Sequence, residues 1–79
     1  MAKMDVFSWL SEYLEDEFGI AEIHEDDAFM NELALSSLDI FNLIADLEYD
    51  FDIKVSEKLI REMITVRDMV AVIGKLVEG

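Results

Sequence analysis

The chain lacks cysteine and proline entirely, and its 79 residues include three glycines and one histidine. Without cysteine, neither disulfide bonds nor thiolate-bound metals can stabilise so small a domain, so helix packing must do so. The scarcity of proline and glycine leaves no linker, no low-complexity tract and no glycine-rich phosphate loop. We therefore expect one small domain spanning residues 1–79.

Long apolar runs are also missing, since no stretch approaches the roughly 20 residues that a membrane-spanning helix needs. The first residues lack the charged region followed by an apolar region that is typical of a secretory signal. We therefore expect no membrane insertion and a cytoplasmic monomer, and the absence of thiols is consistent with a reducing compartment.

Positive charge is scarce, because 6 lysines and arginines face 19 acids, for a net charge of −13. Residues 1–53 hold 15 of the acids and a single lysine, whereas residues 54–79 are nearly neutral. Such a chain repels nucleic acid and anionic membrane surfaces, and it attracts basic protein partners. A composition that is 53% hydrophobic nevertheless allows a core. The charge could also serve only to keep a small domain soluble.

The apolar residues that are present recur with the period of a helix. We predict helices at about Met4–Phe18, Ser37–Phe51, Ser56–Met63 and Val66–Val77. Their inward-facing stripes are Val6, Leu10, Tyr13 and Leu14; Ile40, Leu43, Ile44, Leu47 and Phe51; and Val66, Met69, Val70, Ile73 and Leu76. The predicted fold class is all-α, a four-helix bundle with three longer helices and one short one.

The first helix should end at Gly19, a residue suited to the left-handed position after a helix. Residues 20–35 then form a long loop with a polar run at its centre. Four apolar side chains can pin this loop to the core: Ile20, Ile23, Phe29 and Leu33.

Two helix starts carry the spacing of a capping box. Ser36 and Asp39 can exchange hydrogen bonds with each other's backbone N–H groups, and Thr65 and Asp68 repeat the spacing. If Ser36 caps its helix, Ser37 is the first helical residue and its hydroxyl can point to solvent.

Ser37 is the most informative residue, because a modifying enzyme could reach an exposed hydroxyl at this position. A serine beside a helix start is usually only a cap, and Ser36 stays open as the modified residue. A nucleophilic serine would need a positioned base, and no pattern ties the single histidine, His24, to Ser37. We predict no catalytic residue, so any chemistry arrives on a group attached from outside.

Five acids follow the spacing of a calcium-binding loop: Asp46, Glu48, Asp50, Asp52 and Glu57. The pattern fails where that loop is strict, because Phe51 stands at the position that requires glycine and Lys54 puts a cation beside the ion. We therefore predict no specific metal site, and weak divalent binding to the acidic surface stays open.

Five segments, taken in order, form a known pattern. They are Phe18-Gly19-Ile20, Phe29-Met30-Asn31-Glu32-Leu33, Ser37-Leu38-Asp39, Leu47-Glu48-Tyr49-Asp50-Phe51-Asp52-Ile53-Lys54-Val55 and Ile64-Thr65-Val66-Arg67-Asp68. In this register the chain resembles an acyl carrier protein over nearly its whole length. The Ser-Leu-Asp triplet alone would be weak, but the Leu-Glu-x-x-Phe run at Leu47–Phe51 and the helix start at Thr65-Val66, in register with it, make the resemblance specific.

The resemblance implies a carrier rather than an enzyme. A phosphopantetheinyl transferase would attach 4′-phosphopantetheine from coenzyme A to Ser37, and the thiol of this arm would carry acyl chains as thioesters. The carrier would deliver these chains to enzymes of fatty acid, polyketide or related lipid biosynthesis. The acyl chain could fold back among the helices, in a pocket lined by Ile44, Leu47, Met63 and Ile64; these four can equally be plain core.

The resemblance also implies that the helix Ser37–Phe51 docks acyl-transfer and synthase enzymes that present basic patches. Its candidate docking residues are Asp39, Asp46, Glu48 and Asp50.

Four positions depart from the family pattern. Ser36 stands for the usual aspartate, Ala34 for the usual glycine, and Asn42 and Tyr49 for frequent acids. Ser36 can replace the aspartate as a cap but not its charge. We interpret the chain as a specialised carrier with a restricted set of partners. The alternatives are an unmodified acidic helical module that binds basic proteins, and a divalent-ion binder.

Overall fold

The computed structural model describes residues 5–78, which form four helices. They are α1 (Val6–Phe18), α2 (Ser37–Phe51), α3 (Glu57–Glu62) and α4 (Val66–Glu78). This confirms the all-α prediction, and the helix ends agree within one residue, except that the predicted start at Met4 lies outside the described residues. None of the described helices is long and apolar enough to cross a membrane.

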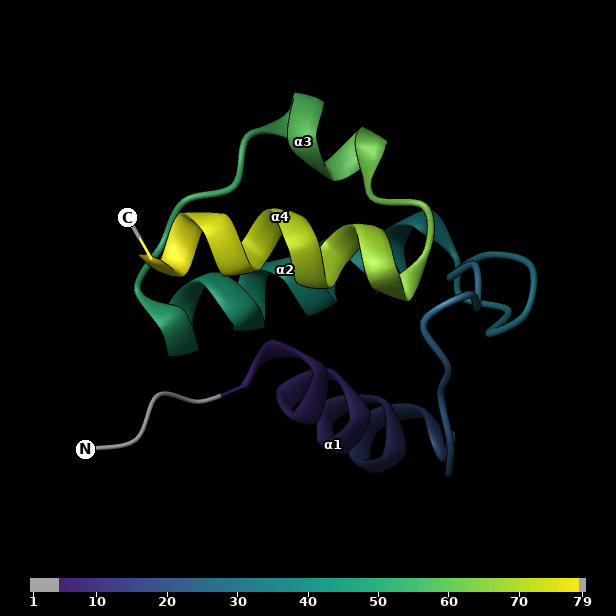
Figure 1. Cartoon of the computed structure of the whole chain (residues 1–79). Coiled ribbons are helices and arrows are strands. Elements are labelled where there is room, and N and C mark those ends of the chain that lie inside the picture. Colours follow the sequence, from purple (N-terminus) through teal and green to yellow (C-terminus); the bar gives the residue numbers. More distant parts are fainter. Residues whose placement is uncertain (1–4, 79) are drawn as a thin grey trace.

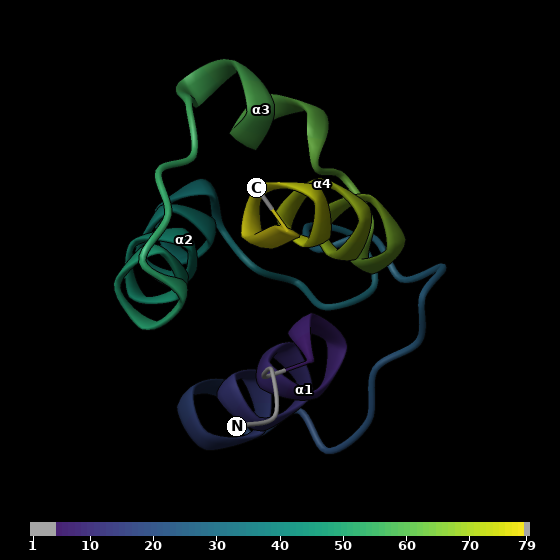
Figure 2. The same cartoon turned by 60° about the vertical axis from the view of Figure 1, so that its left-hand side comes forward.

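The three longer helices surround one core, and the short helix α3 lies on the side opposite α1 (Figures 1 and 2). The innermost side chains are Leu10, Leu14, Phe29, Leu43, Ile44, Leu47, Val66, Met69 and Ile73. The predicted stripes are thus confirmed at their centres, whereas Tyr13, Phe51, Val70 and Leu76 at their margins are only partly buried.

The helix ends follow the local sequence signals. Gly19 ends α1 in the left-handed conformation, with φ 71°, and its N–H donates to the carbonyl of Glu15. The capping box of α2 is complete, because the Asp39 N–H donates to Ser36 Oγ (3.1 Å) and the Ser36 N–H donates to Asp39 Oδ2 (3.0 Å).

The second predicted capping box opens α4. The Asp68 N–H donates to Thr65 Oγ1, and the Thr65 N–H donates to Asp68 Oδ2 at 3.1 Å. The backbone hydrogen bond from Thr65 is the main cause that holds the pKa of Asp68 below its usual value. Because the bond favours the charged carboxylate, the cap weakens as Asp68 is protonated in acid.

The loop between α1 and α2 is held against the junction of α3 and α4. The Phe29 N–H donates to the carbonyl of Ile64, and the Val66 N–H donates to the carbonyl of Asp27, each at 3.0 Å. Ile23 and Phe29 are buried, and Ile20 and Leu33 pack against the core, as predicted. These bonds keep the loop beside the start of α2, where Ser37 lies.

Two hydrogen bonds join α1 to α2 through aromatic side chains. Trp9 Nε1 donates to Asp50 Oδ2, and the Tyr13 hydroxyl donates to Asp46 Oδ2, both at 2.7 Å. The two rings stack with their centroids 4.9 Å apart. Burial, reinforced by the bond to Asp46, raises the pKa of Tyr13 above its usual value. Tyr13 therefore stays a protonated donor, and α1 is fastened to one side of α2.

Substitution of Asp50 by alanine tests this fastening. We expect a loss of about 1 kcal/mol in the free energy of unfolding, because the Trp9 N–H loses a charged acceptor while alanine favours the helix. Asp50→Asn keeps a side-chain oxygen that can accept the Trp9 N–H, so its loss in the free energy of unfolding should be smaller. Urea unfolding followed by the fluorescence of Trp9, the one tryptophan of the chain, measures both. Asp16→Ala, at an exposed site on α1, is the matched control, and equal losses at Asp16 and Asp50 would contradict the expectation.

Candidate functional site

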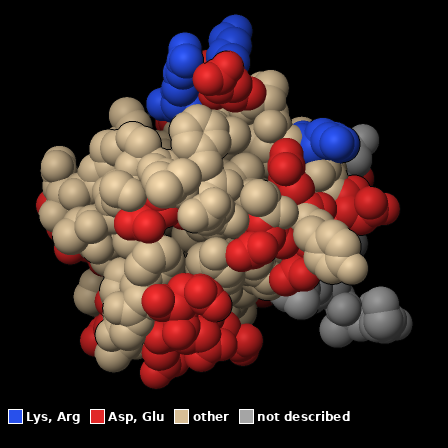
Figure 3. All heavy atoms as spheres, turned by 180° about the vertical axis from the view of Figure 1, so that it is seen from behind, with Lys and Arg blue, Asp and Glu red and all other residues tan. Residues whose placement is uncertain are grey.

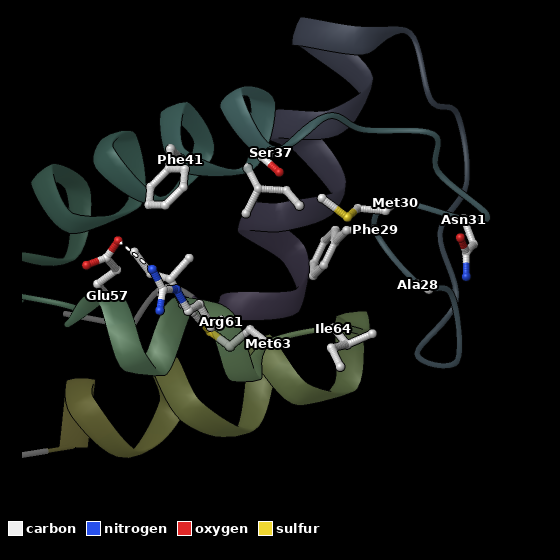
Figure 4. A pocket seen from close by; sticks show the side chains of 12 residues that line it. Ala28, Phe29, Met30, Asn31, Ser37, Phe41, Glu57, Arg61, Met63 and Ile64 are labelled. Carbon is white, nitrogen blue, oxygen red and sulfur yellow. Dashed lines mark hydrogen bonds and ion pairs between the residues drawn. The ribbon is translucent and has the colours of Figure 1, made fainter.

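Ser37 lies at the mouth of a groove of about 530 Å³. The groove is bounded by the start of α2, by α3 and its link to α4, and by part of the α1–α2 loop (Figure 4). Its lining residues are Ala28, Phe29, Met30, Asn31, Ser37, Ile40, Phe41, Glu57, Ile60, Arg61, Met63 and Ile64. Segments far apart in the sequence thus meet beside one exposed hydroxyl.

The groove is mainly apolar and opens to solvent. Phe29 and Met63 form buried parts of its wall, with 1% and 3% of their surface exposed. Met30, Phe41 and Ile64 are 52%, 43% and 63% exposed, so they form an apolar rim. Apolar side chains left in water favour an apolar guest, because its binding removes their surface from water.

The two adjacent serines differ in what their hydroxyls do. Ser36 Oγ accepts the N–H of Asp39, whereas no hydrogen bond from the described residues engages the exposed Ser37 hydroxyl. Ser37 is also the first residue of α2, where unpaired N–H groups and the helix dipole favour an anion such as a phosphate. The site therefore suits a phosphate-linked group on Ser37, with the groove available to an attached chain.

The predicted pocket residues divide into two pairs. Met63 and Ile64 line the groove, whereas Ile44 and Leu47 are buried in the core, with 2% and 0% exposed, and are not among its lining residues. The sequence analysis missed Phe41, although its position four residues after Ser37 places both on one side of the helix. It also missed Met30 and Ile60, which no local spacing connects to Ser37.

Each of the four predicted docking acids accepts a hydrogen bond within the fold. Asp39 belongs to the capping box, and Asp46 and Asp50 bind the aromatic side chains of α1. Half-buried Glu48 accepts the N–H of Val55 at 2.6 Å. These acids contribute negative charge to the surface, and each also accepts a hydrogen bond within the fold.

The calcium-loop spacing does not produce a cluster. The helix α2 continues through Phe51, so Asp46 and Asp50 turn toward α1 while Glu48 bonds to the segment after the helix. Within residues 5–78, no three acidic or histidine side chains are placed to hold a metal ion. The single histidine, His24, pairs with Glu22 and is not among the residues that line the groove with Ser37.

Acidic side chains form scattered patches on the face seen in Figure 3, and they gather most densely in its lower part, where α1 lies in Figure 1. Lys and Arg side chains stand at the upper end, near α3, which carries Lys58 and Arg61, and a further basic side chain lies on the right of this view. A wide area without charge extends between these regions. The overall field attracts cations, but the surface is not uniformly acidic.

Ala34, where the family pattern has glycine, adopts the left-handed conformation with φ 59°. A side chain with a Cβ is strained there by about 1–2 kcal/mol. We expect Ala34→Gly to raise the free energy of unfolding by about 0.5–1 kcal/mol, since glycine removes the strain but enlarges the unfolded ensemble. Ala45→Gly, in the middle of α2, should lower it by a similar amount. Urea titrations measure the free energy of unfolding of both variants. A lower value for Ala34→Gly than for the unsubstituted chain would show that Ala34 is not strained.

Comparisons with known proteins identify the family to which the chain is similar. The family model of the phosphopantetheine attachment site matches residues 8–73. The chain is 34% identical over 67 residues to an acyl carrier protein of Clostridium acetobutylicum, an alignment that covers 82% of this chain and 87% of that protein. It is 28% identical over 76 residues to an acyl carrier protein of Thermotoga maritima, with 94% of each chain covered.

Proposed function

The chain belongs to the acyl carrier protein family, and from this we infer that its 4′-phosphopantetheine group is attached to Ser37. Members of this family are carriers rather than catalysts, and they interact with phosphopantetheinyl transferases and acyl-handling enzymes. The observation that supports Ser37 is its exposed hydroxyl at the start of α2, which no hydrogen bond within residues 5–78 engages, together with the adjoining apolar groove. Ser36 is the weaker candidate because its hydroxyl caps the helix.

The attached arm supplies a thiol that holds an acyl chain as a thioester, and this chemistry explains how a protein without cysteine handles such chains. We propose that the groove shelters part of the arm or chain, with Met63 and Ile64 in contact with it and Phe41 at the rim. Ile44 and Leu47 would join this pocket only if the core loosened toward the groove, because both are buried in the core.

We further propose that α2 and its surroundings receive enzymes of fatty acid, polyketide or related lipid biosynthesis. The net charge of −13 supports attraction of basic partners from a distance, and Asp39, Asp46, Glu48 and Asp50 add to that field. Single exposed ion pairs contribute below about 1 kcal/mol and are screened by salt, so docking through them is transient. A carrier that visits several enzymes requires such release.

The experiment that tests the function is an intact-mass measurement. The folded, initially unmodified protein is incubated with coenzyme A, Mg²⁺ and a promiscuous phosphopantetheinyl transferase. We expect a gain of one phosphopantetheinyl group. No gain with several transferases would instead favour an acidic helical module that binds basic proteins without modification.

A further inference from the structure

The outward face of α2 carries no charge. Leu38, Asn42, Ala45 and Tyr49 recur at the spacing that places residues on one side of a helix, opposite its buried stripe. All four are exposed, and Leu38 and Tyr49 are 69% and 87% exposed. We call them the neutral stripe. It begins beside Ser37 and extends about 16 Å along the helix, at about 1.5 Å per residue.

The acids of α2 lie beside this stripe and are directed to other parts of the fold. Asp46 and Asp50 accept hydrogen bonds from α1, and Glu48 accepts the backbone N–H of Val55. Asp46 and Asp50 remain exposed beside the stripe, so the stripe itself is uncharged although acids flank it.

Neither solubility nor core packing accounts for a nearly fully exposed tyrosine in line with an exposed leucine. Tyrosine is enriched at protein interfaces, and contiguous exposed apolar side chains mark places where partners bind. A second copy of the chain is a poor occupant, because two chains of charge −13 repel each other. The stripe therefore suits a different protein as its partner. Because the stripe begins beside Ser37, this position indicates an enzyme that acts on the group attached to Ser37.

We propose that the neutral stripe is the contact surface for the enzymes that act on the group at Ser37, and that their matching patch is uncharged and apolar. This proposal rests on the function proposed for Ser37. The charge of the whole chain steers the approach of a partner, whereas the stripe forms the contact. The partner patch is thus apolar where it covers Leu38 and Tyr49, rather than rich in lysine and arginine.

A matched pair of substitutions tests whether partner contact depends on the neutral stripe or only on the charge of the whole chain. Ala45 and Ala71 are both exposed alanines within helices, on α2 and α4, so Ala45→Glu and Ala71→Glu change the net charge equally. The probe is the phosphopantetheinyl transferase encoded in the same genome, with coenzyme A and Mg²⁺, and the readout is KM and kcat for transfer.

We expect Ala45→Glu to raise KM at least about tenfold, since its carboxylate would be buried against an apolar patch, and Tyr49→Ala to raise KM several-fold. The KM of Ala71→Glu should stay within about twofold of the KM of the unsubstituted chain, because this substitution changes only the electrostatic field far from the stripe. Circular dichroism of each variant confirms that it is folded.

A lower KM for Ala45→Glu would reveal a basic partner patch and overturn the proposal, and so would equal effects of the two glutamates. In both cases transfer to Ser37 would still occur, so the proposed function would stand. Absence of any transfer to the unsubstituted chain would overturn both the proposed function and this inference.

Discussion

Alanine at position 37 should abolish the gain of a phosphopantetheinyl group. Transfer forms a bond between the deprotonated serine oxygen and the phosphorus that carries the pantetheine arm, and it breaks the pyrophosphate bond of coenzyme A, which releases adenosine 3′,5′-bisphosphate. Ser37→Ala removes the one hydroxyl that is exposed beside the groove and free of a hydrogen bond within residues 5–78. Intact mass after incubation with coenzyme A, Mg²⁺ and a transferase should show the added group on the unsubstituted chain and none on the variant. The expected loss is complete, because no other group replaces the acceptor oxygen.

Ser36→Ala is the control for this experiment. It removes the cap of α2 and should lower the free energy of unfolding by about 1 kcal/mol, yet the modification should remain. If Ser36→Ala loses the added group while Ser37→Ala keeps it, the attachment site is Ser36. Loss with both variants, in folded protein, would mean that transfer requires the capped geometry as well as the Ser37 hydroxyl. Where Ser36→Ala keeps the added group, peptide mapping of this variant identifies the modified residue.

Truncation of Phe29 should have the largest effect on stability. This side chain comes from the loop, is 1% exposed, and contributes both to the core and to the groove wall. Burial predicts a loss of about 3–5 kcal/mol for Phe29→Ala. A domain of this length has about 4–12 kcal/mol in total, so the variant should be largely unfolded or close to it. Urea unfolding followed by circular dichroism and by Trp9 fluorescence measures the loss.

Two further variants keep that result interpretable. Phe29→Leu retains part of the buried side chain and should show an intermediate loss in a protein that still folds. Met30→Ala, at the next residue, removes a side chain that is 52% exposed and should cost about 0.5 kcal/mol or less. Similar small losses for Phe29→Ala and Met30→Ala would show that the loop does not depend on its buried anchor.

Much of the architecture could be predicted from the sequence, because its determinants are local. The periodicity of apolar residues located the four helices, and Gly19 and the pairs Ser36–Asp39 and Thr65–Asp68 located three of their ends. The capping signals act within about one helical turn and the periodicity within a single helix, so no knowledge of distant residues was needed. The same reasoning placed Ser37 at the start of α2, outside the capping box.

The groove and the fate of the acids were decided only by tertiary structure. Helical spacing marks Ile44 and Leu47 as apolar, but it does not tell whether they face a groove or the core; packing against the other helices buried both. Met30 and Ile60 line the same groove as Ser37 because backbone bonds hold the loop against the junction of α3 and α4.

The acids of α2 show the same division. Sequence analysis counted them as one docking set, since spacing specifies charge and helix position but not the donor on a neighbouring element. The fold instead supplied Trp9, Tyr13 and the N–H of Val55 as donors to Asp50, Asp46 and Glu48. The sequence alone therefore determined where the helices and the exposed serine lie. Contacts between distant segments decided which side chains line the groove and which donors the acids of α2 bind.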